Sequence, residues 1–159
     1  MAMKSEKLYK RAGIYIAPSA YGLPVDLEEA LASCKAFIRK NRELKLMRIY
    51  WDDEVTVVRT SEQNGRRTPL GVTGNDAWQR LLRDTETSAI EVIVIYAART
   101  VAPSISGLAR LIREYFLPCG IRLIDVEAGF DSETGDVEDY LKHRNREYRS
   151  TLYGRKAAE

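Results

Sequence analysis

The sequence predicts an α/β protein with a mainly parallel sheet of four to five strands and helices on both faces. Strand-like and helix-like segments alternate along the chain, and this order is typical of a parallel sheet. The most apolar segment, "AIEVIVIY" from Ala89 to Tyr96, has the composition of a central strand covered on both faces. With 159 residues, the chain is long enough to bury such a core as one domain, 1–159.

The first half of the chain begins with a strand, a helix and a second strand. The first strand is expected at Ala12–Ala17, and Pro18 ends it. A helix follows over Asp26–Asn41, where apolar residues recur at helical spacing and Asp26 is placed to cap the first turn. The second strand is expected at Leu44–Trp51.

A β-hairpin is predicted between Val55 and Gly74, with strands at Val55–Thr60 and in "RRTPLGV". Asn64-Gly65 lies between them and is a strong signal for a tight turn. A short helix capped by Asn75 is expected next, and its inward face would contain Ala77, Trp78, Leu81 and Leu82.

Three further elements are expected after the central strand. Ser104 can cap a helix that ends at Pro118. A fourth strand is predicted at Ile121–Val126, and a long last helix begins near Asp136 and runs towards Gly154. Apolar residues recur at helical spacing along this last helix and form a partial stripe, which we expect to contact a partner subunit: Val137, Tyr140, Leu141, Tyr148 and Leu152.

Composition narrows the classes of function. The net charge of +2 is too small to indicate a nucleic-acid partner by itself, although six basic residues against the single acid Glu147 fall between Lys142 and Lys156. No apolar run reaches membrane-spanning length and no signal peptide is visible, so we expect no membrane partner. Cys34 and Cys119 are expected to be buried free thiols in a reducing cytoplasm.

A metal site is not expected. The single histidine, His143, and the absence of a Cys/His cluster exclude a typical zinc site. Asp52 and Asp53 are adjacent acids, but no third ligand converges with them for a magnesium ion. The same pair is also what a solvated turn after a strand contains.

Candidate functional residues follow three predicted strands. Ser19, Asp52 and Arg99 each come just after a strand. Because the carboxyl ends of parallel strands lie at one edge of the sheet, where ligands bind in such folds, these side chains are expected at one edge.

The order of several segments resembles the catalytic domain of the serine recombinases, the resolvase/invertase group, from about Ala12 to Ala158. The segments are "YIAPS", "RIYWDD", "AWQRLLRD", "VIVIYAARTVA", "IRLIDVEAGFDSETG" and "HRNREYRSTLYGRKAA". The resemblance implies a resolvase-like fold with an inserted hairpin and a long C-terminal helix. It also implies attack of a serine hydroxyl on a DNA phosphodiester, a phosphoserine link, and no metal or nucleotide cofactor.

Matched residue by residue, the resemblance assigns only part of a catalytic set. Tyr15, Ser19, Asp52 and Arg99 fall on its positions. Three arginine positions are occupied instead by Ala17, Asn75 and Ala102, a glutamine position by Ala30, and a glutamate position by His143.

The missing arginines predict an inactive enzyme. Charge develops on the phosphate oxygens during attack, and without a metal only fixed guanidinium groups stabilise it. Each lost donor typically costs about 10²–10³ in rate. We therefore interpret the chain as a recombinase-like domain acting in assembly and in association with DNA.

Two alternatives remain open. The first is an active site-specific recombinase using Ser19, with Arg59, Arg66 or Arg67 of the hairpin replacing the lost cations. The second is a flavodoxin-like domain that binds a small anion, which the absence of a glycine-rich phosphate loop makes less favoured.

The resemblance also implies that the long helix makes a homodimer and lies on DNA. A basic face on that helix would make salt-sensitive contacts to phosphates through Arg144, Arg146, Arg149, Arg155 and Lys156. No separate DNA-binding module is recognised within the sequence.

Overall fold

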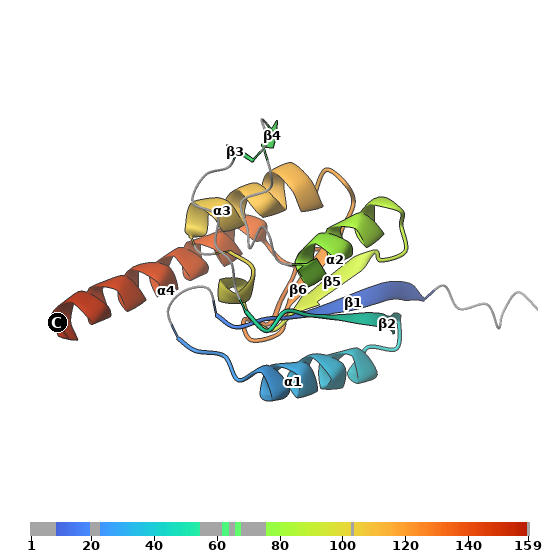
Figure 1. Cartoon of the computed structure of the whole chain (residues 1–159), viewed down its shortest axis with the longest axis horizontal. Coiled ribbons are helices and arrows are strands. Elements are labelled where there is room, and N and C mark those ends of the chain that lie inside the picture. Colours follow the sequence, from blue (N-terminus) through green and yellow to red (C-terminus); the bar gives the residue numbers. More distant parts are fainter. Residues whose placement is uncertain are drawn as a thin grey trace, which may run out of the picture.

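Five strands form one sheet in the order β2-β1-β5-β6-β7 (Figure 1). The computed structural model describes residues 9–19, 23–54, 62–63, 66–67, 76–102 and 104–158, with 62–63, 66–67 and 150–158 described for the backbone alone. The strands are β1 (Lys10–Ile16), β2 (Leu44–Trp51), β5 (Val92–Ile95), β6 (Arg122–Asp125) and β7 (Phe130–Asp131). All neighbouring pairs are parallel except β6 with β7. The predicted mainly parallel sheet with β5 at its centre is confirmed.

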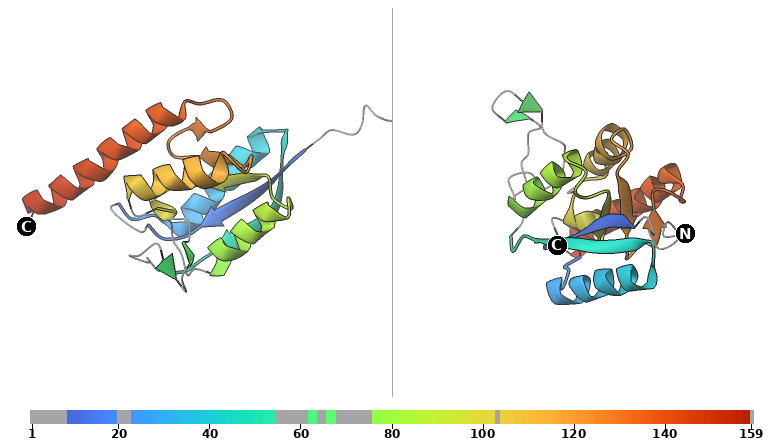
Figure 2. Two further views of the ribbon diagram at one scale, coloured as in Figure 1. Left: turned by 90° about the horizontal axis from the view of Figure 1, so that it is seen from above. Right: turned by 90° about the vertical axis from the view of Figure 1, so that its right-hand side faces the viewer.

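Helices cover both faces of the sheet, as predicted. They are α1 (Leu27–Lys40), α2 (Asp76–Glu86), the short 3-10 turn η2 (Ala98–Thr100), α3 (Ile105–Arg110), the π-helical continuation η3 (Leu111–Phe116) and α4 (Val137–Ala158). Helix α1 lies alone on one face, while α2 and α3 lie on the other (Figure 2). The far end of α4 projects away from the layers (Figures 1 and 2).

Local signals in the sequence explain where helices begin. The Asp26 side chain accepts a hydrogen bond from the Glu29 amide at 3.0 Å, and the Ser104 hydroxyl accepts one from the Gly107 amide at 3.1 Å. Both residues were predicted as caps. The proposed cap Asn75 lies outside the described residues.

The predicted hairpin is present as two short antiparallel strands, β3 (Glu62–Gln63) and β4 (Arg66–Arg67). Their register pairs Gln63 with Arg66 and so places Asn64-Gly65 between the strands. The segment Val55–Thr60, predicted as a longer strand, lies outside the described residues.

Two apolar layers stabilise the sheet. Residues of α2, α3, η3 and α4 pack on one face around Trp78, while α1 packs on the other around Cys34. Gly13 allows close packing within the first layer, because a Cβ atom there would lie 2.9 Å from Cε2 of Tyr50.

Three expectations from the sequence were wrong or incomplete. Cys119 is exposed rather than buried, while Cys34 is buried. The strand β7 was not predicted. The stripe on α4 packs on its own domain rather than offering a free face. Tyr140, Leu141 and Tyr148 are buried, and Val137 packs against the apolar cluster that contains Tyr140 and Leu141. The Leu152 side chain is outside the described residues.

Within the described ranges, no helix has the length and apolarity to cross a membrane.

Candidate functional site

The carboxyl ends of β1, β2, β5 and β6 meet at one edge of the sheet, which we call the strand-end edge. Tyr15 lies in β1, and Ser19 lies half-buried three residues beyond its end. Asp52 directly follows β2, and its backbone amide donates to the Ile16 carbonyl at 3.0 Å. Arg99 lies in η2, just after β5. The predicted grouping of these elements at one edge follows from the parallel register.

Asp52 is joined to both the sheet and α2. The Tyr15 hydroxyl donates to Asp52 Oδ2 at 2.8 Å. The amides of Ala77 and Trp78 donate to the same carboxylate at 3.0 and 3.1 Å. These amides belong to the first turn of α2, where backbone donors lack partners within the helix. Asp52 is therefore a half-buried helix-capping residue rather than a solvated turn acid.

Two of the positions that lack an arginine are filled by core packing. Ala17 is 1% exposed and Ala102 is fully buried. Both belong to the apolar cluster that contains Tyr15 and Trp78, whose rings contact edge to face with centroids 4.9 Å apart. The third position, Asn75, is outside the described residues. At Ala17 and Ala102 the strand-end edge therefore has buried methyl groups, where the resemblance would place guanidinium groups.

Arg99, the arginine that matches the family position, is bound by an acid. Its guanidinium donates to both Glu127 oxygens at 2.6 and 3.1 Å and to the Leu23 carbonyl at 2.9 Å. Its side chain is only 15% exposed. Hydrogen bonding to Glu127 raises the pKa of Arg99 above its ordinary value. The positive charge of Arg99, which a phosphate would need as its partner, is therefore already paired with Glu127.

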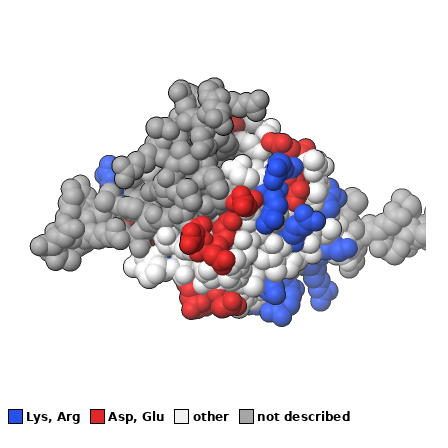
Figure 3. Space-filling model, in the orientation of Figure 1, with Lys and Arg blue, Asp and Glu red and all other residues white. Residues whose placement is uncertain are grey.

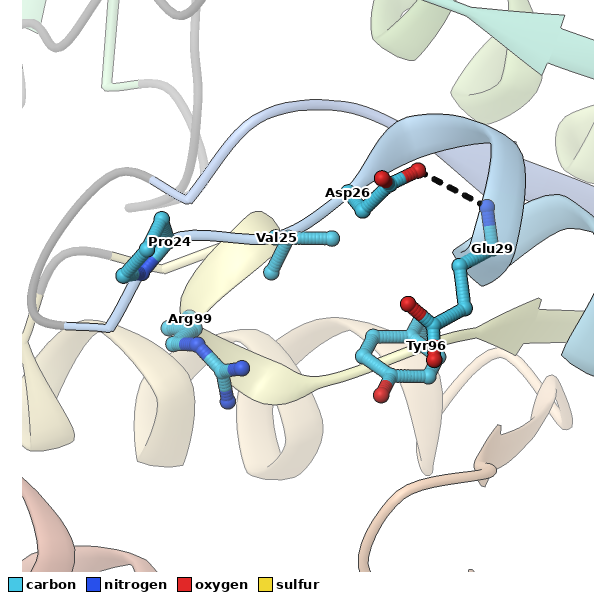
Figure 4. Close-up of a pocket in the computed structure, with 6 residues that line it drawn as sticks. All are labelled: Pro24, Val25, Asp26, Glu29, Tyr96 and Arg99. Carbon is cyan, nitrogen blue, oxygen red and sulfur yellow. Dashed lines mark hydrogen bonds between the residues drawn. The ribbon is translucent and has the colours of Figure 1, made fainter.

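A hollow beside Arg99 is lined by acids as well as by this arginine. Its volume is about 390 Å³, and Figure 4 shows the six lining residues: Pro24, Val25, Asp26, Glu29, Tyr96 and Arg99. Burial first, and then the charges of Glu127 and Glu29, raise the pKa of the Tyr96 hydroxyl. Two carboxylates and a paired arginine make this hollow a poor site for an anion.

A buried acid that the sequence reading did not single out lies at the end of β6. Asp125 is fully buried, accepts from the Tyr140 hydroxyl at 2.6 Å and accepts from the Ala128 amide at 3.1 Å. Burial raises the pKa of Asp125 to about 6. The signal in the sequence is the acid that ends the apolar run "IRLID".

A second tyrosine of α4 reaches the strand-end edge. The Tyr148 hydroxyl donates to the Ala102 carbonyl at 2.7 Å. Together with the bond from Tyr140 to Asp125, this contact fixes α4, as far as Tyr148, against the end of β6 and the segment that follows η2. Cys34 lies on the other layer, and burial raises the pKa of its thiol to about 12, so this thiol is not an activated nucleophile.

The basic residues proposed for DNA contact on α4 differ in their surroundings. The Arg144 side chain is 12% exposed, pairs with Glu147 at 3.4 Å and lies over the Tyr140 ring at 5.3 Å. Arg146 and Arg149 are exposed. The side chains of Arg155 and Lys156 are outside the described residues. Arg144 is therefore committed to packing, which leaves Arg146 and Arg149 as the described exposed cations of the proposed set.

In the described part of the chain, no group of three or more His, Cys, Asp or Glu side chains is placed to hold a metal ion. Asp52 and Asp53 illustrate this, because Asp52 binds backbone amides and Asp53 accepts from the Trp51 indole N–H at 2.7 Å.

The fold is that of the serine recombinase catalytic domain. No family model and no curated protein matches the sequence, but solved structures do match. The N-terminal catalytic domain of TP901-1 integrase superposes with a TM-score of 0.64 at 17% identity, covering 90% of this chain and 98% of that one.

Two further structures carry the same fold. A resolvase family site-specific recombinase from Streptococcus pneumoniae matches with a TM-score of 0.60 at 18% identity, covering 94% of this chain and 99% of that one. The C-terminal catalytic domain of ISC1926 TnpA, an IS607-like serine recombinase, has a TM-score of 0.52 at 18% identity and covers 73% and 70%. The expected resolvase-like fold is thereby confirmed at the level of chain architecture.

Proposed function

We propose that this recombinase-like domain does not cleave DNA and acts instead in assembly and in association with DNA. The observation that carries the proposal is the state of the cationic positions at the strand-end edge. Ala17 and Ala102 are buried in the core, and Arg99 is paired with Glu127.

The chemistry of phosphodiester attack explains why this state matters. A serine hydroxyl is a weak nucleophile, and the charge that forms on the phosphate must be stabilised by donors already in place. An arginine that is paired with a carboxylate must break that pair before it can bind a phosphate. We therefore expect Ser19 to lack the electrostatic support that strand cleavage requires.

The competing function is an active recombinase. Tyr15, Ser19 and Asp52 are retained, and the Tyr15–Asp52 bond of 2.8 Å holds two of them in a defined geometry. This alternative requires cations from segments outside the described residues, such as Arg59, to approach Ser19.

A search for covalent protein–DNA adducts separates the two functions. The full chain is incubated with supercoiled DNA carrying diverse sequences, denatured, and examined for DNA linked to protein. We expect no adduct from the wild type, while an established serine recombinase run in parallel gives one. An adduct that persists in the matched control Ser106→Ala but disappears in Ser19→Ala would establish the enzyme.

Assembly through α4 is supported by the shape of the molecule. The far end of α4 projects beyond the layers (Figure 1), and an isolated helical segment is only marginally stable in water. We propose that a second copy covers this end. Sedimentation equilibrium should give the mass of a dimer at micromolar concentration, and a monomer throughout the range would contradict the proposal.

We also propose a cytoplasmic location. Cys34 and Cys119 are both free thiols, which suits a reducing compartment. Fractionation of cells that express the chain tests this, and recovery in an oxidising compartment would exclude it.

A further inference from the structure

Five exposed cations surround the connection from α1 to β2, at the opposite end of the sheet from the strand-end edge. Arg39 and Lys40 end α1, Arg42 follows in the turn, Lys45 is the second residue of β2, and Lys10 opens β1. All five are exposed. The neighbouring strand starts are joined directly, because the Lys10 amide donates to the Glu43 carbonyl at 2.8 Å and Lys10 pairs with Leu44. We call these five residues the basic edge.

Nearby negative charge does not neutralise the basic edge. Within the described part of the chain, the structure records no ion pair for any of its five cations. Glu43 lies among them, but its carboxylate accepts from Arg122 at 2.9 Å. The C-terminal end of a helix carries only about half a negative charge, which Arg39 and Lys40 already exceed. Lys10, Arg42 and Lys45 lie outside the helix, so capping does not explain them.

The strand-end edge has the opposite sign. Six exposed acids lie on elements that reach it, and the structure records no ion pair for them among the described residues: Asp26, Glu28, Glu29, Asp53, Glu54 and Asp76. In Figure 3 basic groups concentrate on the side where β1 and β2 begin, with some acidic groups beside them at the top, while acidic groups predominate on the side where these strands end. A phosphate backbone is therefore repelled at the strand-end edge and attracted at the other.

We propose that the basic edge binds the phosphate backbone of duplex DNA. The proposal adds a surface to the DNA association inferred above and uses none of the α4 residues. Exposed Lys and Arg side chains without an apolar pocket between them suit phosphate contacts, which position a protein on DNA without reading sequence. A protein partner normally requires a buried apolar centre within the charged rim. Among the described residues next to these cations, the large exposed apolar side chains are the two single residues Tyr9 and Met47, which do not make such a centre.

Neutralisation of three cations tests the assignment. The full chain and the variant Lys40→Gln/Arg42→Gln/Lys45→Gln are titrated with a short DNA duplex of arbitrary sequence over a range of salt concentrations. We expect affinity at low salt to fall at least tenfold. The slope of log affinity against log salt should decrease in magnitude by about 3, because each phosphate contact contributes about 0.9.

A matched variant on α4, Lys142→Gln/Arg146→Gln/Arg149→Gln, removes the same charge from three exposed cations. Because Arg146 and Arg149 belong to the proposed α4 contact set, we expect this variant to weaken binding and lower the slope, but by less than the basic-edge variant does. Equal loss in both variants, loss confined to the α4 variant, or no DNA binding by the wild type would each overturn the proposal. Binding of polyglutamate in preference to DNA would also overturn it and indicate an acidic protein partner. Matching thermal unfolding curves would show that both variants are folded.

Discussion

At the residue scale, Asp52 shows how a position expected in a catalytic set also holds the fold. Its carboxylate receives the Tyr15 hydroxyl from β1 and two amides from the first turn of α2. A carboxylate at a helix start is also favoured by the helix dipole. These contacts give Tyr15 and Asp52 a structural role, so a catalytic role is not needed to explain why the two residues occupy these positions.

Replacing Asp52 should destabilise the domain. Asp52→Ala removes the cap of α2 and leaves the Tyr15 hydroxyl without this acceptor, so we expect the free energy of unfolding to fall by about 1–2 kcal/mol. Chemical denaturation measures the change. Glu54→Ala, an exposed acid two residues away, is the matched control. Equal stability of the two variants would show that the capping contacts contribute little.

Asp125 is a second residue whose surroundings determine its chemistry. It is fully buried, and burial raises its pKa from 3.8 to about 6. Between pH 3.8 and about pH 6, Asp125 holds its proton in the folded chain but has released it in the unfolded chain. The folded state then binds more protons, so the contribution of Asp125 to the free energy of unfolding decreases as pH rises through this window.

The pH dependence of stability tests this directly. Relative to Asp125→Asn, which titrates no proton at this site, the wild type should lose on the order of 2–3 kcal/mol between acidic and neutral pH. Most of the loss should fall between 3.8 and about 6. Denaturant titrations of both proteins at a series of pH values measure it. Parallel pH profiles would mean that Asp125 titrates normally.

At the element scale, α4 is held by two tyrosine hydroxyls. Tyr140 donates to Asp125, and Tyr148 donates to the Ala102 carbonyl. The stacked rings of Phe130 and Tyr140, with centroids 3.9 Å apart, add apolar contact. These contacts attach α4, as far as Tyr148, to β6, β7 and the segment after η2, while its far end projects from the domain (Figure 1).

Loss of one hydroxyl should loosen the helix without unfolding the sheet. For Tyr148→Phe we expect about 1 kcal/mol less stability and faster hydrogen exchange at α4 amides, with β5 amides unchanged. Hydrogen exchange followed by mass spectrometry makes the comparison, and Tyr9→Phe, whose side chain is exposed, serves as the control. Uniformly faster exchange in every element would argue against a local anchor.

The elements themselves were largely predictable from local signals. Asp26 and Ser104 initiate α1 and α3 through side-chain caps, and the apolar run at Val92–Ile95 forms the central strand, because each depends on few neighbouring residues. The strand β7 was missed because two residues give no periodic pattern. The role of the α4 stripe was misjudged because helical spacing shows that Tyr140 and Tyr148 share a face but not which surface covers it.

At the scale of the whole molecule, the candidate site was predictable in part. Parallel strand order brings Tyr15, Asp52 and Arg99 to one edge, as alternating elements indicate. The bond between Arg99 and Glu127, and the burial of Ala17, depend on tertiary packing between segments distant in sequence. Such contacts leave no local pattern, and the same is true of the separation of charge between the two edges.

Titration of the isotope-labelled chain with inorganic phosphate, followed by NMR at each backbone amide, tests the central claim most directly. A site with several free arginine side chains binds a tetrahedral anion. The strand-end edge instead contains buried methyl groups at Ala17 and Ala102 and an arginine that is paired with Glu127. We expect no saturable shift at the amides of Ala17, Ser19, Arg99 and Ala102. Saturable shifts confined to Ser19 and these neighbours would contradict the claim and restore the interpretation of an active recombinase.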